Sequence, residues 1–98
     1  SAMEYKLITG IRSIYPNPFN PSTTISYELN KKAEVKIEIY NNRGQVIQTF
    51  ALGQKDKGRY KLIWEGKDKN NSNCGCGIYF IRMLVDRESY MQKVTLLK

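Results

Sequence analysis

The stretch Asp-Lys-Asn-Asn-Ser-Asn, residues 68–73, has side chains that come nearest to a metal site. Carboxylate, amide and hydroxyl oxygens grouped in a short loop are the ligands that Ca²⁺ prefers. This loop, however, has one carboxylate, at Asp68, lies among lysines and has no glycine at its turn. Because calcium affinity follows the charge of the ligands, we favour a solvated loop over a weak calcium site.

Cys74 and Cys76 are the other candidates for chemistry. Residues two apart rarely reach disulfide geometry without strain, so a bridge between them is not expected. A structural zinc site needs four ligands, and the chain has no histidine to complete the set. We predict small thiols beside a turn, and we expect neither a metal nor another cofactor.

Catalytic arrangements are missing from the sequence. Without histidine there is no Ser-His-Asp or Cys-His set, and the usual general base is absent. Gly75-Cys76-Gly77 is too short for a phosphate loop and precedes a predicted strand rather than a helix. The nine Asp and Glu residues are dispersed, and a small domain has little room for a cleft between two of them. We therefore expect no enzyme and no catalytic residue.

The elements that would position any site are strands. Apolar and polar residues alternate over 24–29, 35–40 and 60–64, which is typical of half-buried strands, and no helical period appears. Asn41-Asn42-Arg43-Gly44 is a hairpin turn that closes on a glycine of positive φ and leads into a return strand over 45–52. Loops are predicted at 53–58 and 65–73.

The last third of the chain completes the pattern. Residues 77–85 are apolar on both faces, as in a central strand, residues 86–89 form a turn, and residues 90–97 form the last strand. This spacing predicts an all-β fold, an immunoglobulin-like antiparallel β-sandwich of about seven strands, with an eighth if residues 6–14 contribute one. One domain of this kind fits a chain of 98 residues.

Two apolar groups have alternative interpretations. Trp64 alternates with Leu62 at strand spacing, so we predict that it lies in the core rather than on a carbohydrate-binding platform. Ile78, Phe80 and Leu84 form the second face of their strand. They are either covered by another layer or exposed as a patch that marks a partner site.

All three prolines, Pro16, Pro18 and Pro21, lie in a short stretch just before the first alternating strand. Proline fixes φ and cannot donate a ladder hydrogen bond, so this stretch is not a central strand. We predict an extended, partly polyproline lead-in with turns at Asn17 and Asn20, whose preset φ values lower the entropy lost on folding.

The charge is unbalanced, with 16 Lys and Arg against nine Asp and Glu and a net charge of +7. The cations are scattered rather than clustered, which favours solvated strand faces over nucleic-acid binding. No apolar run is long enough to span a membrane, so membrane insertion is not expected. Residues 1–3, Ser-Ala-Met, are interpreted as an expression scar, residues 4–14 as a linker or first edge strand, and residues 15–98 as the domain.

Several segments occur together in one order: YPNPFNPSTTISYEL (15–29), IYNNRGQVI (39–47), GRYKLIW (58–64), WEGKDKN (64–70), CGIYFIRM (76–83) and KVTLLK (93–98). This set resembles the C-terminal sorting domains of the type IX secretion system (Por secretion type A). It is similar as well to their relative, the immunoglobulin-like domain of the flagellar hook-capping protein. The chain departs from the sorting domains near Asn71 and at Cys74 and Cys76, where the family usually has other residues.

The resemblance implies a non-catalytic domain at the end of a secreted multidomain protein. Such a domain is recognised by the outer-membrane translocon, is removed by a sortase-like peptidase, and directs its N-terminal cargo domains through the periplasm to the cell surface or the medium. It places sorting-motif positions at Gly77, Tyr79, Lys93, Val94 and Lys98, and a fold signature at Pro16, Asn17, Pro18, Gly44, Gly58 and Trp64.

The terminal strand is where recognition would be expected. If residues 90–97 lie at a sheet margin, their edge can be captured by strand addition, with Lys93 and Lys98 read alongside it. Equally, these lysines can serve only to protect the edge from aggregation. A hook-cap-like or adhesion module is the alternative function, and a carbohydrate-binding module is a third.

Overall fold

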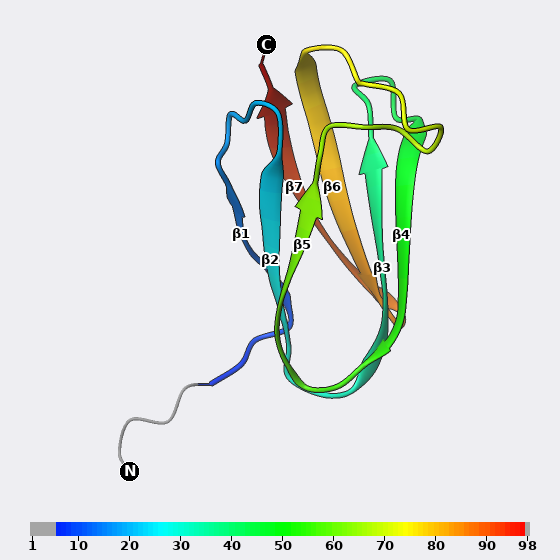
Figure 1. Cartoon of the computed structure of the whole chain (residues 1–98). Coiled ribbons are helices and arrows are strands. Elements are labelled where there is room, and N and C mark those ends of the chain that lie inside the picture. Colours follow the sequence, from blue (N-terminus) through cyan, green and yellow to red (C-terminus); the bar gives the residue numbers. More distant parts are fainter. Residues whose placement is uncertain (1–5, 98) are drawn as a thin grey trace.

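The computed structural model describes residues 6–97, which form seven strands and, within that range, no helix (Figure 1). The strands are β1 Gly10–Tyr15, β2 Thr23–Leu29, β3 Ala33–Tyr40, β4 Val46–Lys55, β5 Gly58–Trp64, β6 Gly77–Val85 and β7 Glu88–Leu96. Since the described part of the chain has no helix, it has none that could cross a membrane. The predicted all-β sandwich of about seven strands is confirmed.

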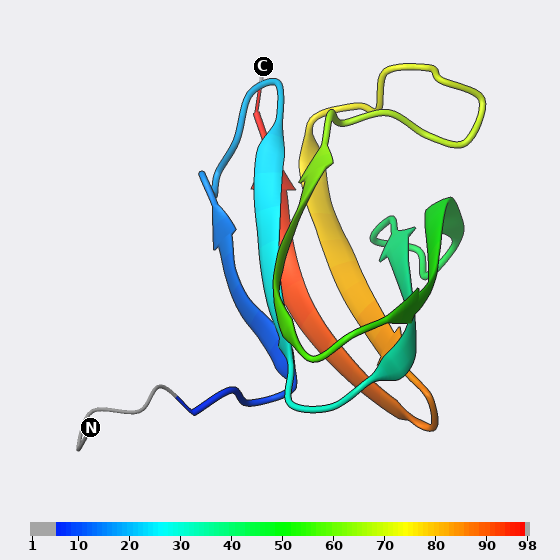
Figure 2. The same ribbon diagram turned by 60° about the horizontal axis from the view of Figure 1, so that its bottom comes forward.

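The strands form two antiparallel sheets that face each other (Figures 1 and 2). One has three strands in the order β1-β2-β5, and the other has four in the order β4-β3-β6-β7. In constant-type immunoglobulin domains the fourth strand joins the sheet of the first two. Here a tight hairpin keeps β4 beside β3, because the Asn41 N–H donates to the Gln45 carbonyl at 3.0 Å and Gly44 has φ +80° as predicted.

The core lies between the sheets and is built by the alternating residues. Fully buried aliphatic side chains come from β2, β3 and β6, and Trp64 at the end of β5 is 1% exposed, as predicted. The Trp64 ring lies 5.3 Å from that of Phe19 and 5.4 Å from that of Tyr79, centroid to centroid. These three aromatic rings fill the end of the sandwich at which β7 finishes.

Two expectations about boundaries were wrong. Gly53 to Lys55 continue β4 instead of opening a loop, because a bulge accommodates Gly53 opposite Val35. The turn before the last strand is shorter than predicted, since Asp86 adopts φ +50° and β7 begins at Glu88. The strand considered for residues 6–14 is present, as the first of the seven described strands rather than as an eighth. Residues 10–15 are β1, one of the seven, at the edge of the three-stranded sheet.

The proline segment, residues 16–21, bends on both sides of Phe19, at Asn17 and Asn20 where turns were predicted, so it is less extended than predicted. Phe19 is 1% exposed, and its backbone bridges the end of β7: its N–H donates to the Thr95 carbonyl, and its carbonyl accepts from the Leu97 N–H, both at 2.9 Å. The segment thus has the role of a short parallel strand on the outer edge of β7.

Gly66 allows this segment to pack closely. It is buried and has φ +70°, and a Cβ placed on it would lie 3.1 Å from the Pro21 carbonyl oxygen. Both the φ value and the space available therefore require glycine at this position. Residues 1–3 lie outside the described residues, so their interpretation as an expression scar stays a prediction.

Candidate functional site

Four of the five predicted sorting-motif positions come together in the structure. In the pairing of β6 with β7, Gly77 lies opposite Leu96, Tyr79 opposite Val94, and Phe80 opposite Lys93. Gly77 and Tyr79 thus lie on the strand next to that of Lys93 and Val94, at the end of the sheet where β7 finishes, and Tyr79 and Val94 are direct partners. Lys98 lies outside the described residues.

Two of these positions are core residues rather than exposed contacts. Val94 is fully buried and Tyr79 is 8% exposed. The Tyr79 hydroxyl donates to the Gly75 carbonyl at 2.6 Å, four residues upstream, which is the arrangement of the tyrosine corner in immunoglobulin-like domains. Burial, together with nearby Cys74, raises the pKa of Tyr79, so the phenol stays a neutral donor. Because both side chains are buried, a partner protein would depend on the fold that they stabilise rather than on direct contact with them.

Lys93 is the one exposed side chain of the four. Its backbone carbonyl accepts a hydrogen bond from the Asn17 side-chain amide at 3.2 Å, and Asn17 Oδ1 accepts from the Thr95 N–H at 3.1 Å. The fold-signature residue Asn17 therefore holds the terminal strand directly. Its neighbours Pro16 and Pro18 are exposed, and the Pro16 carbonyl accepts from the Thr23 hydroxyl at 2.7 Å.

The other fold-signature positions shape turns and the core. Gly44 closes the β3–β4 hairpin, Gly58 opens β5 after the two-residue connection from β4, and Trp64 anchors the aromatic group. The Trp64 indole N–H also donates to the Lys67 carbonyl at 2.9 Å, which fixes the start of the loop over 65–76.

The terminal strand does lie at a sheet margin, as strand addition requires. Much of that margin is already occupied. The outward-facing backbone groups of Lys93, Thr95 and Leu97 bond to Asn17 and Phe19. Nearer the start of β7, the Gln92 side chain donates to the Ile11 carbonyl of β1 at 3.4 Å. A strand added along this edge would have to displace the proline segment.

The loop considered for calcium is organised by its own carboxylate. Asp68 Oδ1 accepts from the backbone N–H groups of Asn70 and Ser72 at 2.9 and 3.0 Å, and Asn71 takes φ +64°. Among the described residues no group of three Asp, Glu, Cys or His side chains could hold a metal ion. Asp68 therefore has a structural role within this turn.

Both cysteines are free thiols, and they differ in accessibility. Cys74 is buried, and its pKa is raised by burial and by the nearby Asp68 charge, whereas a hydrogen bond with Tyr79 lowers it. Cys76 is exposed. The raised pKa keeps Cys74 protonated and unreactive, in keeping with a packing role.

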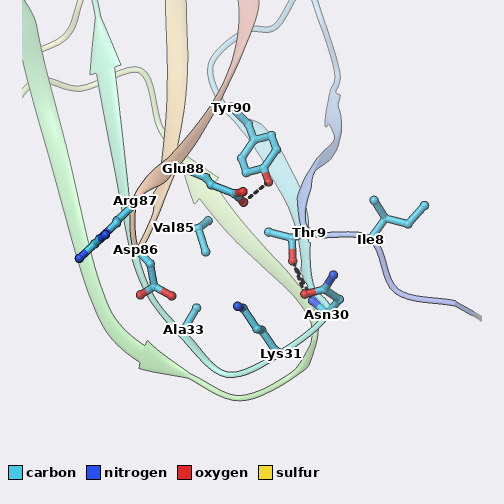
Figure 3. A pocket seen from close by; sticks show the side chains of 10 residues that line it. All are labelled: Ile8, Thr9, Asn30, Lys31, Ala33, Val85, Asp86, Arg87, Glu88 and Tyr90. Atoms are coloured by element: carbon cyan, nitrogen blue, oxygen red, sulfur yellow. Dashed lines mark hydrogen bonds between the residues drawn. The ribbon is translucent and has the colours of Figure 1, made fainter.

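A hollow of about 550 Å³ lies at the opposite end of the sandwich, where residues 8 and 9 approach β1 (Figure 3). Four of its polar residues form two hydrogen-bonded pairs. The Thr9 hydroxyl donates to Asn30 Oδ1 and accepts from the Asn30 N–H, both at 2.9 Å, and the Tyr90 hydroxyl donates to Glu88 Oε1 at 2.9 Å. This hydrogen bond, more than burial, raises the pKa of Tyr90.

Glu28 is a residue whose position the sequence did not reveal. Its alternation with Tyr27 and Leu29 predicted a solvent-facing carboxylate, yet it is 4% exposed. Its carboxylate accepts from the Ile8 N–H at 3.2 Å and lies 3.5 Å from Arg12 Nε and 3.9 Å from Arg59 Nε. Cations at both flanking strands cover it, so it ties the incoming chain to the three-stranded sheet. Only the tertiary pairing brings these arginines together.

With this geometry described, the chain can be compared with known proteins. The family model of the FlgD Ig-like domain matches residues 17–89, so the chain belongs to that family. A search of curated proteins found no match.

Solved structures share the fold. A domain in dimeric latent PorU from Porphyromonas gingivalis superposes with a TM-score of 0.79 at 18% identity, over 96% of this chain and 10% of that one. FlgD from P. aeruginosa gives 0.62 at 24% identity, over 76% of this chain and 60% of that one. PorZ, described as an essential surface component of the type IX secretion system of Porphyromonas gingivalis, gives 0.62 at 16% identity, over 91% and 12%. The chain thus spans a small part of PorU and PorZ.

Proposed function

We propose that this immunoglobulin-like domain is a non-catalytic C-terminal sorting domain of a secreted multidomain protein. The type IX translocon recognises it in the periplasm, and a sortase-like peptidase separates it from its cargo. The cargo then reaches the cell surface or the medium. No enzyme activity, nucleic acid or membrane insertion is part of this function.

The observation that supports this proposal best is the pairing of Gly77 and Tyr79 with the end of β7. This pairing brings the motif positions on β6 and β7 together. It also places them beside the proline segment, which is far from them in the sequence. Tyr79 and Val94 are buried, so the motif acts by maintaining a folded unit from which Lys93 projects. The shared fold of PorU and PorZ is consistent with this function.

The proposal can be tested by fusing residues 4–98 behind a periplasm-directed fluorescent reporter in a host with a working type IX system. We expect reporter at the surface or in the medium with the intact domain and in the periplasm with Val94→Asp, which buries a charge in the core. A Lys93→Ala variant should keep the fold, and it tests whether the translocon recognises the exposed lysine side chain. Retention of the intact, demonstrably folded domain in the periplasm would overturn the proposal.

A hook-cap-like assembly or adhesion module is the second candidate, and the family match favours it specifically, since that model is built on FlgD. Position separates the two functions, because a sorting domain must end its protein while an assembly module need not. Appending a folded domain after residue 98 should abolish sorting in the first case. Unchanged behaviour would favour the assembly module.

A further inference from the structure

The outer face of the four-stranded sheet carries an ordered set of apolar and cationic side chains. On β6, the residues that alternate with the buried Tyr79, Ile81 and Met83 point away from the core. The register places Phe80 between Lys93 of β7 and Tyr40 of β3, and it places Arg82 between Met91 and Glu38. We call this set, with Ile78, the outer face.

No second layer of the described residues covers the outer face, although Phe80 and Leu84 on β6 are half-buried. Ile78 is 43% exposed and Met91 is 54% exposed. A hollow of about 390 Å³ lies among Tyr40, Phe80, Arg82 and Met91, beside the hairpin turn that contains Asn41, Asn42 and Gly44. Its walls supply aromatic rings and a flexible thioether, which adapt to an apolar side chain.

The charges around this hollow are unbalanced. The one carboxylate on these central rows, Glu38, already accepts from the Tyr40 hydroxyl at 2.6 Å and lies 3.7 Å from Lys36 Nζ. Arg82 donates through Nη1 to the same hydroxyl at 3.2 Å. Within the described residues Arg82 and Lys93 form no salt bridge. The hollow is therefore lined by apolar side chains together with Arg82, and Lys93 lies beside it, opposite Phe80.

We propose that the outer face binds an acidic polypeptide segment of a partner protein, with an apolar side chain in the hollow and carboxylates on Arg82 and Lys93. Charge complementarity selects this occupant, because a second copy of a chain with net charge +7 would place cations against cations. The face is favoured over the β7 edge, much of which the proline segment and Gln92 occupy. This inference rests on the proposed function, because the sorting function would identify the partner as a protein of the secretion machinery.

Binding is tested on the full chain by nuclear magnetic resonance titration with two capped peptides, Glu-Glu-Leu-Phe-Glu-Glu and Lys-Lys-Leu-Phe-Lys-Lys. We expect the acidic peptide to shift the resonances of Phe80, Arg82 and Met91 until they saturate. We also expect it to bind at least about tenfold more tightly than the basic peptide, because its charges complement those of the outer face. Raising the salt concentration should weaken it. Equal binding of both peptides, binding of neither, or shifts elsewhere would overturn the inference.

A matched pair of variants locates the site. Met91→Glu/Lys93→Glu changes one exposed apolar residue and one lysine on the outer face. Ile63→Glu/Lys61→Glu makes the same change on the three-stranded sheet, where Ile63 is 60% exposed. Both pairs are exposed, so both variants should fold. Loss of acidic-peptide binding in the first pair alone supports the inference, and equal loss or no loss contradicts it.

The reporter fusion separates this inference from the proposed function. If the first variant pair is retained in the periplasm while the second is sorted, the outer face is the surface that the translocon reads. If both are sorted, sorting stands and the outer face is not its recognition surface. If the intact domain is itself not sorted, the proposed function fails, while peptide binding by the outer face is still decided by the titration. Concentration-dependent dimerisation through Met91 would assign the face to a second copy and overturn the inference.

Discussion

The two ends of the sandwich are built differently. At the C-terminal end, defined here by Phe19, Trp64, Tyr79, Val94 and Leu96, every side chain is at most 8% exposed, and backbone and amide hydrogen bonds join segments more than seventy residues apart. At the entry end, defined by Ile8, Thr9, Asn30 and Tyr90, Ile8 is 56% exposed and the hydrogen bonds join half-buried side chains to exposed ones (Figure 3).

We therefore expect the residues of the C-terminal end to contribute more to the free energy of unfolding than those of the entry end. Burial of large aromatic surface and satisfaction of a sheet edge occur at the C-terminal end, where the predicted sorting motif and the fold signature meet. The four residues that define the entry end are less buried, since Ile8 and Asn30 are exposed and Thr9 and Tyr90 are half-buried.

Removing the central aromatic ring should have the largest effect. Trp64→Ala should lower the free energy of unfolding by about 3–5 kcal/mol, because it leaves a cavity beside Phe19 and Tyr79. Ile8→Ala, at the entry end, should change it by less than about 0.5 kcal/mol. Urea unfolding followed by circular dichroism measures both. Similar losses at the two ends would remove the distinction between them.

Two tyrosine hydroxyls give a finer comparison. Tyr79→Phe removes the donor to the Gly75 carbonyl in a part-buried site and should cost about 1–2 kcal/mol. Tyr90→Phe removes an exposed bond to Glu88 and should cost less than about 0.5 kcal/mol. The same unfolding measurement applies. A larger loss for Tyr90→Phe would show that the corner hydrogen bond is not important.

The hydrogen bonds from Asn17 to β7 should slow hydrogen exchange in that part of the strand. Asn17→Ala loses the bonds to Lys93 and Thr95 and should cost about 1 kcal/mol, with faster hydrogen exchange at the Thr95 amide. Thr9→Ala also loses two hydrogen bonds, to Asn30, but should leave the exchange of β7 unchanged. Unaltered exchange at Thr95 in the Asn17 variant would mean that Phe19 alone holds the strand.

Raising the pH into the alkaline range should produce the smallest change in the free energy of unfolding. Burial raises the pKa of Tyr27 and Tyr79 above the ordinary 10.0, so folding favours their neutral forms. Their contribution to stability is complete below about pH 10 and is lost as pH rises through the folded-state pKa values. Unfolding at increasing pH, with tyrosinate absorbance as the second readout, should show a smaller loss in Tyr79→Phe than in the parent. A loss of equal size would place the effect at other groups.

Much of the fold could be predicted from local patterns. Alternation located β2, β3 and β5, the apolar run over 77–85 identified a central strand, and Asn41–Gly44 identified the hairpin. Boundaries were less accurate where a bulge extended β4 and where Asp86 shortened a turn, since both depend on the partner strand. The burial of Glu28 could not be predicted, because it needs Arg12 and Arg59 from two other strands.

The sequence alone determined the class of the fold, the absence of histidine chemistry and the placement of Trp64 in the core, because these follow from residue types and their period. Tertiary structure decided the rest. It paired β6 with β7 so that Tyr79 meets Val94, it placed Asn17 and Phe19 on the edge of the last strand, and it left Phe80 and Met91 on an open face. These contacts join residues that are distant in the chain, and long-range register is set by packing of the whole sandwich rather than by any local pattern.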